Sequence, residues 1–487
     1  MFFIIGSFSK AFALPLYNST LDHSIIQLIN DNAIESPMKI SDLYLRYADI
    51  EQSRIGRDYV INNHNEIQKN PIYAKTNIFS KNINPDNRMI SFQRVKYLTK
   101  ISDKIHNVSG LIIFPPDKSP KGVILYFHPT VFNKVSVPSI KFDDTKSDML
   151  AAVYAANGYI VIVPDYIGLG DDFINEHPYI LYPTLNVEDG RSILQYSIQV
   201  LKNRNIQLNY KNIPLYVSGF SEGALYALWF SRLYQHDSNF YTSINNLGFK
   251  LKQTVATSGP YDVSHVMIPF LLSNQINQTS NEYKVNTTMW GTLLKPALFA
   301  NTMLTYAAYE GIKPEAIFNR RFFNLKCTNG YPICFHFDKQ RNYSISTVRM
   351  INLNQMIMAL NYFFSALGIS NEIGEMYGLF NNGVTGLLRT RDYHDPVMKV
   401  AEHADIINWN STNPVTLISL SNDSVVPSLN SEHSYNGMVE SGSLNLKYIK
   451  VNSSSLKSRA FVGPDEIDHV NFEIYSMFIT LKEFLNH

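Results

Sequence analysis

The chain has 487 residues, and its 42 Lys and Arg against 41 Asp and Glu give a formal net charge of +1. This balance excludes the basic excess of proteins that bind nucleic acid, so we expect no nucleic-acid partner. Hydrophobic residues reach 45% and aromatic residues 13%, enough for a large core and too much for a disordered chain.

The N-terminus reads MFFIIGSFSKAFALPLY. A short apolar run at residues 2–8 precedes the small-x-small sequence AFA at 11–13, which is typical of an export signal and its cleavage site. We therefore expect residues 1–13 to be a signal peptide of a secreted or periplasmic protein, and 14–88 to be an N-terminal extension. A buried N-terminal strand is the alternative. No other stretch approaches the ~18 apolar residues of a membrane span, so we expect no transmembrane segment.

From residue 89 onward, strand patterns alternate with helix patterns. The expected strands are Met89–Leu98, Val108–Phe114, Val123–Phe127, Tyr159–Pro164, Ile213–Ser218, Thr254–Ser258, Val415–Leu420 and Leu446–Val451. The expected helices are Ser147–Asn157, Val187–Asn203, Ser221–Tyr234 and about Val470–Asn486. We interpret the Pro- and Gly-rich residues 115–122 as a hairpin connection. The uniformly apolar strands predict an α/β fold, a mostly parallel sheet with helices on both faces.

One long segment interrupts this alternation. Residues 261–400 are rich in Met, Leu, Phe and Tyr and have helical patterns such as Thr288–Tyr309 and Thr347–Leu367. The segment is close to a typical domain in length. We therefore expect one discontinuous α/β core, formed by residues 89–260 and 401–487, with residues 261–400 inserted as a helical block.

The most informative motif is Gly219-Phe220-Ser221-Glu222-Gly223, a G-x-S-x-G sequence. It lies between an apolar strand and an amphipathic helix, which is the context of a nucleophile elbow. The turn is tight, so small residues are needed at Gly219 and Gly223, and the serine hydroxyl is presented at a helix N-terminus. Ser221 is thus the expected nucleophile. The alternative is a purely structural turn.

A serine nucleophile needs a base, and enzymes with this elbow place an acid and then a histidine after it in the chain. Asp423 follows the strand Val415–Leu420 and is the expected acid, although an Asx turn is the alternative. His469 lies between the last strand and the last helix and is the expected base. His433 is only ten residues beyond Asp423, and His487 is the final residue.

An oxyanion hole requires two donors. The amide of Glu222, directly after the nucleophile, is the expected first donor, and the second should come from the loop after Val123–Phe127. That loop begins His128-Pro129-Thr130. Since proline has no N–H, Thr130 is the expected second donor. We expect His128 to be a packed loop residue.

The two cysteines, Cys327 and Cys334, flank the turn-forming sequence TNGYPI. In an exported protein they are expected to form a disulfide, and two buried free thiols are the alternative. We expect no cofactor and no metal, because no phosphate-binding loop and no metal-ligand cluster stands out in the sequence.

With these residues placed, the chain resembles the α/β-hydrolase superfamily. Within it the sequence is most similar to secreted lipases and esterases of the fungal secretory-lipase (lipase A) type and their bacterial relatives. The matching stretches are SGLIIFPPDKSPKGVILYFHPT, GYIVIVPDYIGLGDD followed by HPYI, SGFSEGA, and NDSVV followed by DHVNF. The resemblance implies that the inserted helices form a cap over Ser221, and that Asp165 has a structural role.

Three functions remain open. The first is a serine hydrolase of carboxylic esters, an esterase or lipase acting on a small-molecule ester or lipid and degrading lipid through an acyl-serine. Transient contact with a lipid interface belongs to this hypothesis. The second is a serine peptidase of the same fold, in which Glu222 or a carboxylate of the cap binds a free amine. The third is an inactive ligand-binding protein, which the presence of all three triad residues disfavours.

Overall fold

The computed structural model describes residues 35–39, 89–101, 103–131, 134–140, 145–272, 289–317, 395–452 and 468–486. The predicted signal peptide at 1–13, the cysteine pair and the predicted helix Thr347–Leu367 lie outside the described residues, as does most of the predicted N-terminal extension. The predicted division into core and insertion therefore stays a prediction.

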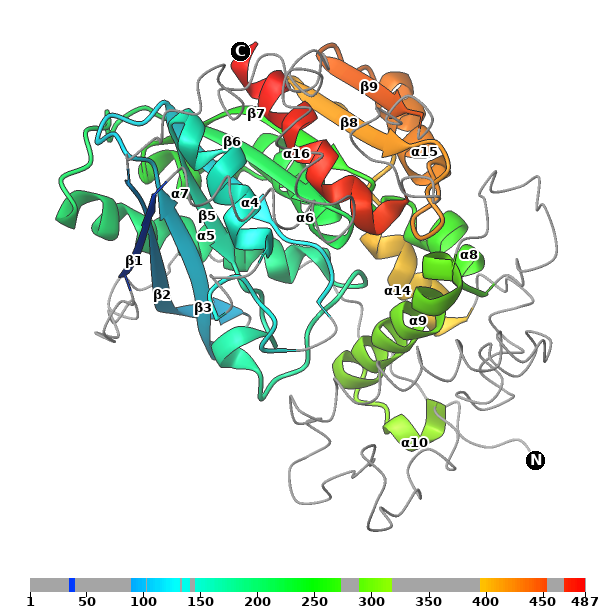
Figure 1. Cartoon of the computed structure of the whole chain (residues 1–487). Coiled ribbons are helices and arrows are strands. Elements are labelled where there is room, and N and C mark those ends of the chain that lie inside the picture. Colours follow the sequence, from blue (N-terminus) through cyan, green and yellow to red (C-terminus); the bar gives the residue numbers. More distant parts are fainter. Residues whose placement is uncertain are drawn as a thin grey trace, which may run out of the picture.

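The described strands form one nine-stranded sheet in the order β1-β2-β3-β5-β4-β6-β7-β8-β9 (Figure 1). From β5 to β9 the neighbouring strands are parallel, whereas β1, β2, β3 and β5 pair in antiparallel fashion. The strands are β1 (Glu35–Lys39), β2 (Met89–Ile101), β3 (Lys104–Phe114), β4 (Gly122–Phe127), β5 (Tyr159–Pro164), β6 (Ile213–Phe220), β7 (Phe249–Thr257), β8 (Val415–Leu420) and β9 (Leu446–Val451).

The predicted hairpin at residues 115–122 is wrong. Strands β3 and β4 are consecutive in the chain, but β5 lies between them and pairs with both. The segment joins an antiparallel strand to the first strand of the parallel region. The apolar run of β5 is fully buried, as expected of a central strand. Because β5 lies between β3 and β4, these two strands cannot pair with each other as a hairpin.

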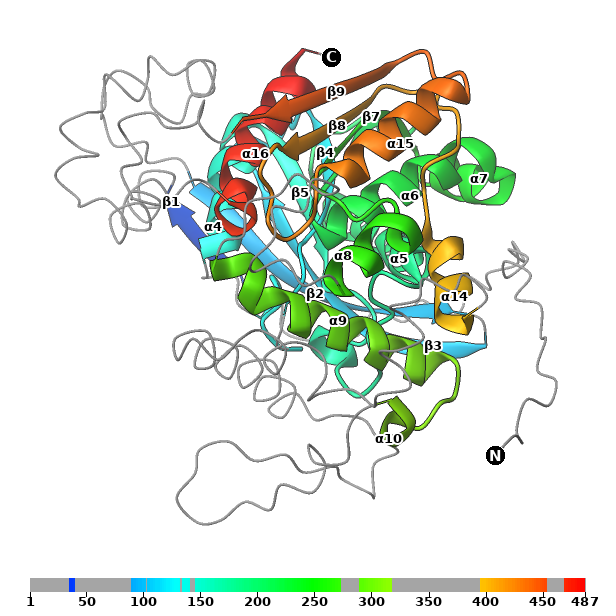
Figure 2. The same ribbon diagram turned by 90° about the vertical axis from the view of Figure 1, so that its right-hand side faces the viewer.

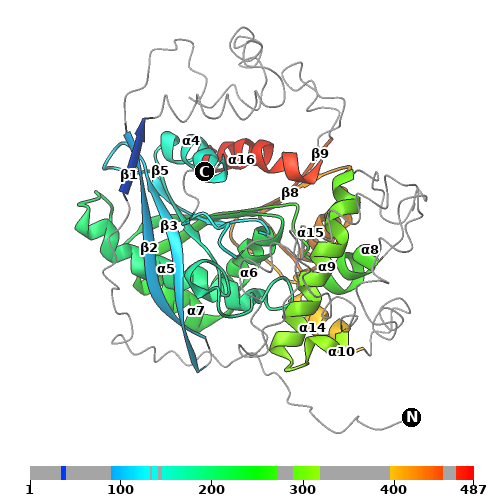
Figure 3. The same cartoon turned by 60° about the horizontal axis from the view of Figure 1, so that its bottom comes forward.

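Helices cover both faces of the sheet. They are α4 (Thr145–Val153), α5 (Pro183–Asn203), α6 (Glu222–His236), α7 (Ser238–Asn246), α8 (Ile268–Leu272), α9 (Met289–Tyr309), α10 (Pro314–Ile317), α14 (Pro396–Ala404), α15 (Leu429–Glu440) and α16 (His469–Leu485), with the short turns η3 (Ala155–Asn157), η4 (Gly170–Asp172) and η5 (Val263–Met267). Figure 3 shows α4 and α16 together on one face, with α5 and α7 across the sheet from them.

Two cores result from the alternation of side chains along the strands. In β4, Val123, Leu125 and Phe127 belong to the core beneath α5, α6 and α7. Ile124 and Tyr126 point the other way, into the core beneath α4 and α16. The prediction of a mostly parallel sheet with helices on both faces is confirmed.

The described part of the predicted insertion is helical. Figure 2 shows α8, α9 and α14 near one another in front of the sheet, on the other side of α15 from β8 and β9. Helix α8 contacts α9, and α14 contacts η5. Among the described residues, no helix is both long and apolar enough to cross a lipid bilayer.

Candidate active site

Ser221 occupies a strained turn between β6 and α6. Its backbone has φ 56° and ψ −124°, a conformation that residues with a side chain rarely adopt and that costs about 1–3 kcal/mol. A Cβ on Gly219 would lie 2.2 Å from the carbonyl oxygen of Gly223, and one on Gly223 would lie 2.0 Å from that of Phe127. Both flanking positions therefore admit only glycine, and the start of α6 packs directly against the end of β4.

Three of the residues predicted from the sequence meet at this turn. The Oγ of Ser221 lies 2.8 Å from Nε2 of His469, and Nδ1 of the same ring lies 2.7 Å from Oδ2 of Asp423. A carboxylate only accepts, so Nδ1 carries a proton and Nε2 is left to accept from the serine hydroxyl. Ser221, Asp423 and His469 are 8%, 0% and 5% exposed. This arrangement can activate a serine nucleophile.

Asp423 forms the alternative Asx turn as well as the contact with histidine. Its Oδ1 accepts the amides of Val425 at 3.0 Å and Val426 at 2.8 Å. One oxygen thus fixes the loop after β8, and the other faces His469. The two interpretations of this residue are compatible, because they use different oxygens of one carboxylate.

Asp468 connects the loop that contains Asp423 to helix α16, which begins at His469. Its Oδ1 accepts the amide of His469 at 2.7 Å, at the N-terminus of α16, and the amide of Ser424 at 3.0 Å. Its Oδ2 accepts the hydroxyl of Ser424. Charged carboxylates at a helix N-terminus are stabilised there. The positions of Asp423 and His469 are therefore linked through a third, buried side chain.

The pKa of His469 is raised above its usual value. Burial by itself lowers this pKa, but the charge of Asp423 and its hydrogen bond more than reverse the effect, and Asp468 and Glu473 act in the same direction. The ring of Phe220 packs against the imidazole at 4.9 Å. The histidine is therefore a stronger base than a free one, and its orientation is fixed on two sides.

The side chain of Glu222 forms a buried pair that the sequence analysis missed. It is 2% exposed, and its Oε1 accepts from Nε2 of His177 and from the hydroxyl of Tyr226, each at 2.6 Å. Nδ1 of His177 lies 2.8 Å from the carbonyl oxygen of Ile167. Both ring nitrogens therefore face oxygen acceptors, so a protonated His177 would donate from both and pair with the Glu222 carboxylate.

The pKa of Glu222 agrees with this pairing. Burial raises this pKa, but the charge and hydrogen bond of His177, with the hydrogen bond of Tyr226, bring it below its usual value. His177 belongs to the stretch HPYI, which the resemblance singled out without giving it a role. The pair joins the residue after the nucleophile to the loop between η4 and α5.

The loop after β4 lies beside the nucleophile turn, since a Cβ on Gly223 would also come within 2.7 Å of the His128 carbonyl oxygen. Thr130, the predicted second donor, shares a hydrogen bond of 3.1 Å between its Oγ1 and the Tyr179 hydroxyl. His128 is buried and stacks on Tyr166 at 4.1 Å. The Tyr166 hydroxyl donates to the His128 carbonyl at 2.7 Å. The His128 ring is thus packed into the loop, whereas the role of the Thr130 amide stays a prediction.

Other predicted residues have other places. His433 lies on α15, where its Nδ1 is 2.7 Å from Oδ2 of Asp262, and His487 lies outside the described residues.

Asp165 accepts from the Ser109 hydroxyl at 2.5 Å and the Ser139 amide at 3.1 Å. Burial raises the pKa of Asp165 to about 6 even though these bonds lower it.

Helix α9 of the predicted insertion contacts the loop that holds His177. The hydroxyl of Thr305 donates to the His177 carbonyl at 2.9 Å, and that of Tyr309 donates to the Glu176 carbonyl at 3.1 Å. The candidate site is therefore bordered by a helix of the predicted insertion as well as by the loops around Ser221.

Several solved structures share this architecture. A proposed hydrolase from Legionella pneumophila is 16% identical, covers 94% of this chain and 98% of its own, and has a TM-score of 0.62. The rice cell wall degrading esterase LipA from Xanthomonas oryzae is 18% identical over 82% of this chain and 91% of its own, with a TM-score of 0.60. Candida antarctica lipase A, 14% identical over 83% of this chain and 80% of its own, has a TM-score of 0.48, too low to carry an argument.

No protein-family model matches the sequence, and no curated protein does. At identities of 16% and 18% the structural likeness shows the fold alone. The chain has the α/β-hydrolase fold, as the sequence predicted.

Proposed function

We propose that this protein is a serine hydrolase that cleaves carboxylic esters through an acyl-serine intermediate. The observation that carries the proposal is the chain of hydrogen bonds from Asp423 through His469 to Ser221, at a turn whose backbone is strained and whose flanking glycines have no room for a side chain. The structure from Xanthomonas oryzae that shares this fold is that of an esterase.

The reaction follows from the geometry. His469 accepts the proton of Ser221 as the oxygen attacks the ester carbonyl, and Asp423 stabilises the imidazolium that forms. The amides of Glu222 and Thr130 stabilise the tetrahedral oxyanion. The proton then passes to the leaving alkoxide, which departs as an alcohol. Water, deprotonated by His469, cleaves the acyl-serine, releases the carboxylic acid and restores the serine.

The paired state of Glu222 favours esters over peptides with a free amine. A peptidase of this kind needs an acidic group that meets the substrate amine, and the sequence offers Glu222 or a carboxylate of the cap. Its carboxylate is 2% exposed and already accepts from His177 and Tyr226. Exposing it to a substrate would break a buried ion pair.

The test uses p-nitrophenyl esters of increasing acyl length, each assayed below and above its solubility limit, on wild type and Ser221→Ala. The control is Ser238→Ala, which changes an exposed serine at the start of α7. We expect Ser221→Ala to lose at least 10³-fold in kcat and Ser238→Ala to keep wild-type activity. Activity in purified Ser221→Ala would remove the proposal.

Two further measurements separate the alternatives. A fluorophosphonate probe should label wild type and leave Ser221→Ala unlabelled, whereas an unlabelled wild type would favour a binding protein. A panel of aminoacyl amides should be cleaved far more slowly than the esters. Higher rates on the amides would favour the peptidase.

Export rests on residues 1–13 alone. Expression with the native N-terminus in a host with a secretory pathway should give a product shortened by that signal, as measured by intact mass. A full-length product would contradict the expectation.

A further inference from the structure

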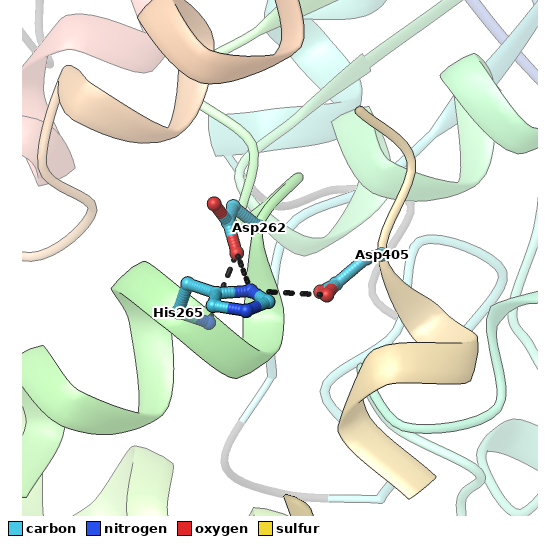
Figure 4. Close-up of side chains that lie close together, drawn as sticks. All are labelled: Asp262, His265 and Asp405. Carbon is cyan, nitrogen blue, oxygen red and sulfur yellow. Dashed lines mark hydrogen bonds and ion pairs between the residues drawn. The ribbon is translucent and has the colours of Figure 1, made fainter. Parts of the chain in front are cut away.

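Asp262, His265 and Asp405 gather at the points where the predicted insertion leaves and rejoins the core. Asp262 lies five residues beyond the end of β7 and caps η5, which also carries His265. Asp405 is the residue that ends α14, ahead of β8. Figure 4 shows both carboxylates pointing toward the His265 ring, one from its own turn and one from the end of α14.

The spacing of the three ligand atoms suits a tetrahedral metal ion. Nδ1 of His265 lies 3.2 Å from Oδ1 of Asp262 and 3.7 Å from Oδ2 of Asp405, and all three ligand atoms lie within 4.8 Å of one another. A tetrahedral ion with bonds of about 2.0–2.1 Å holds its ligand atoms about 3.4 Å apart, which lies between these two distances. The Ser264 hydroxyl lies 2.7 Å from Nδ1 of His265 and donates to Oδ2 of Asp405 at 2.5 Å, so an ion that binds here has to displace this hydroxyl.

Hydrogen bonds to other atoms hold both carboxylates in place. Oδ1 of Asp405 accepts the amides of Val263 at 2.6 Å and Ser264 at 3.0 Å, and Oδ2 accepts the Ser264 hydroxyl at 2.5 Å on the side that faces the histidine. Oδ2 of Asp262 accepts from Nδ1 of His433 at 2.7 Å. Metal sites in proteins use such outer contacts to orient their ligands.

The charge and exposure of the cluster also fit a cation. The two carboxylates lie 3.2 Å and 3.7 Å from Nδ1 of His265 and give the cluster a negative charge that attracts a cation. Asp262 is buried, whereas the side chain of His265 is 47% exposed.

We propose that Asp262, His265 and Asp405 form a binding site for a divalent transition metal, with Zn²⁺ the best match to one imidazole and two carboxylates. His433 acts on the site by orienting Asp262. The ion would fasten the segment that leaves β7 to the segment that enters β8, so its role is structural and separate from the triad. The sequence analysis expected no metal because Asp405 is 140 residues from His265 (405 − 265).

The test uses the full chain, purified without a polyhistidine tag, stripped with EDTA and incubated with Zn²⁺, Mn²⁺ or Ca²⁺ in parallel. After desalting, metal per chain is measured by mass spectrometry of the elements, and the melting temperature is recorded. His265→Ala removes one exposed ligand. His403→Ala is the matched control, because it changes an exposed imidazole on α14 that bonds only the Lys399 carbonyl among the contacts described.

We expect about one Zn²⁺ per wild-type chain and per His403→Ala chain, with melting temperature raised by about 2 °C or more at saturating Zn²⁺. His265→Ala should retain almost none and show no rise. His433→Ala should bind about 10-fold more weakly or worse. The proposal is overturned if wild type retains no Zn²⁺, if His265→Ala retains as much as wild type, or if Ca²⁺ is held better than Zn²⁺. Each of these results would leave the cluster as an ion-pair network.

Discussion

The buried pair of Glu222 and His177 gives a prediction that tests the structure beside the nucleophile. Glu222→Gln keeps the shape of the side chain and removes its charge. The carboxylate is 2% exposed, the histidine side chain is 12% exposed, and the two atoms of the pair are 2.6 Å apart. Removing one partner of a buried pair costs about 3–5 kcal/mol. The partial exposure of His177 places the expected loss at the lower end, at about 3 kcal/mol.

A double-mutant cycle isolates the pair from other effects. If His177 is an imidazolium held by Glu222, the substitution His177→Asn should destabilise Glu222→Gln less than it destabilises wild type. The difference between the two losses in free energy of unfolding should be at least about 1 kcal/mol. Urea denaturation followed by tryptophan fluorescence measures each free energy of unfolding. Glu432→Gln is the control, because Glu432 pairs with Lys450 at the surface and should cost at most about 1 kcal/mol.

The pH dependence gives a second check on the same pair. The folded pKa of Glu222 is lowered, so its contribution to stability is fully present above its unfolded value of about 4.5 and is lost as the pH falls through the folded pKa. Wild type and Glu222→Gln should therefore converge in stability under acid conditions. A loss below about 0.5 kcal/mol at neutral pH, or additive effects in the cycle, would refute the reasoning.

Other predictions concern the triad and its turn. Ser221→Gly should be more stable than Ser221→Ala by about 1 kcal/mol in urea denaturation. Glycine relieves backbone strain of about 1–3 kcal/mol in the folded state, but its greater freedom in the unfolded chain lowers stability by about 0.5–1 kcal/mol. Equal stability of the two variants would contradict the strain. Asp423→Asn should lower kcat by about 10³–10⁴-fold. The acid limb of kcat/KM in wild type should lie above pH 6.5, because the pKa of His469 is raised. Asp423→Asn should move that limb to lower pH. A wild-type limb at or below pH 6.5 would contradict the raised pKa. Gly223→Ala should yield little soluble, active protein, since its Cβ would lie 2.0 Å from the Phe127 carbonyl oxygen; a soluble variant with wild-type activity would show that the turn can move.

Much of the fold could be predicted because its central strands are continuous apolar runs bounded by polar residues. The predicted bounds of β5, β8 and β9 agree with the structure. Helix α15 was missed because its sequence, LNSEHSYNGMVE, is mostly polar and lacks a clear apolar face. The pairing of β3 with β5 could not be predicted, because the apolar pattern of a strand does not specify which neighbour it meets.

The candidate site was predicted to a similar extent and for a related reason. Ser221 and Asp423 each follow a parallel strand, and the carboxyl ends of such strands lie at one edge of the sheet. Their order in the chain, with His469 after them, was therefore enough to predict that the three residues meet. His177 was missed because it lies on a loop with no regular pattern around it. Its partner Glu222 is 45 residues away and is met only through space.

Asp468 accepts hydrogen bonds from both Ser424 and His469, and this link affects the stage of folding at which the triad can form. The acid and the base lie later in the sequence than the nucleophile and are linked to each other through Asp468. A chain still being synthesised presents Ser221 without any base until α16 has emerged and docked. Reactivity toward a fluorophosphonate is therefore also a measure of whether α16 has docked beside the nucleophile turn.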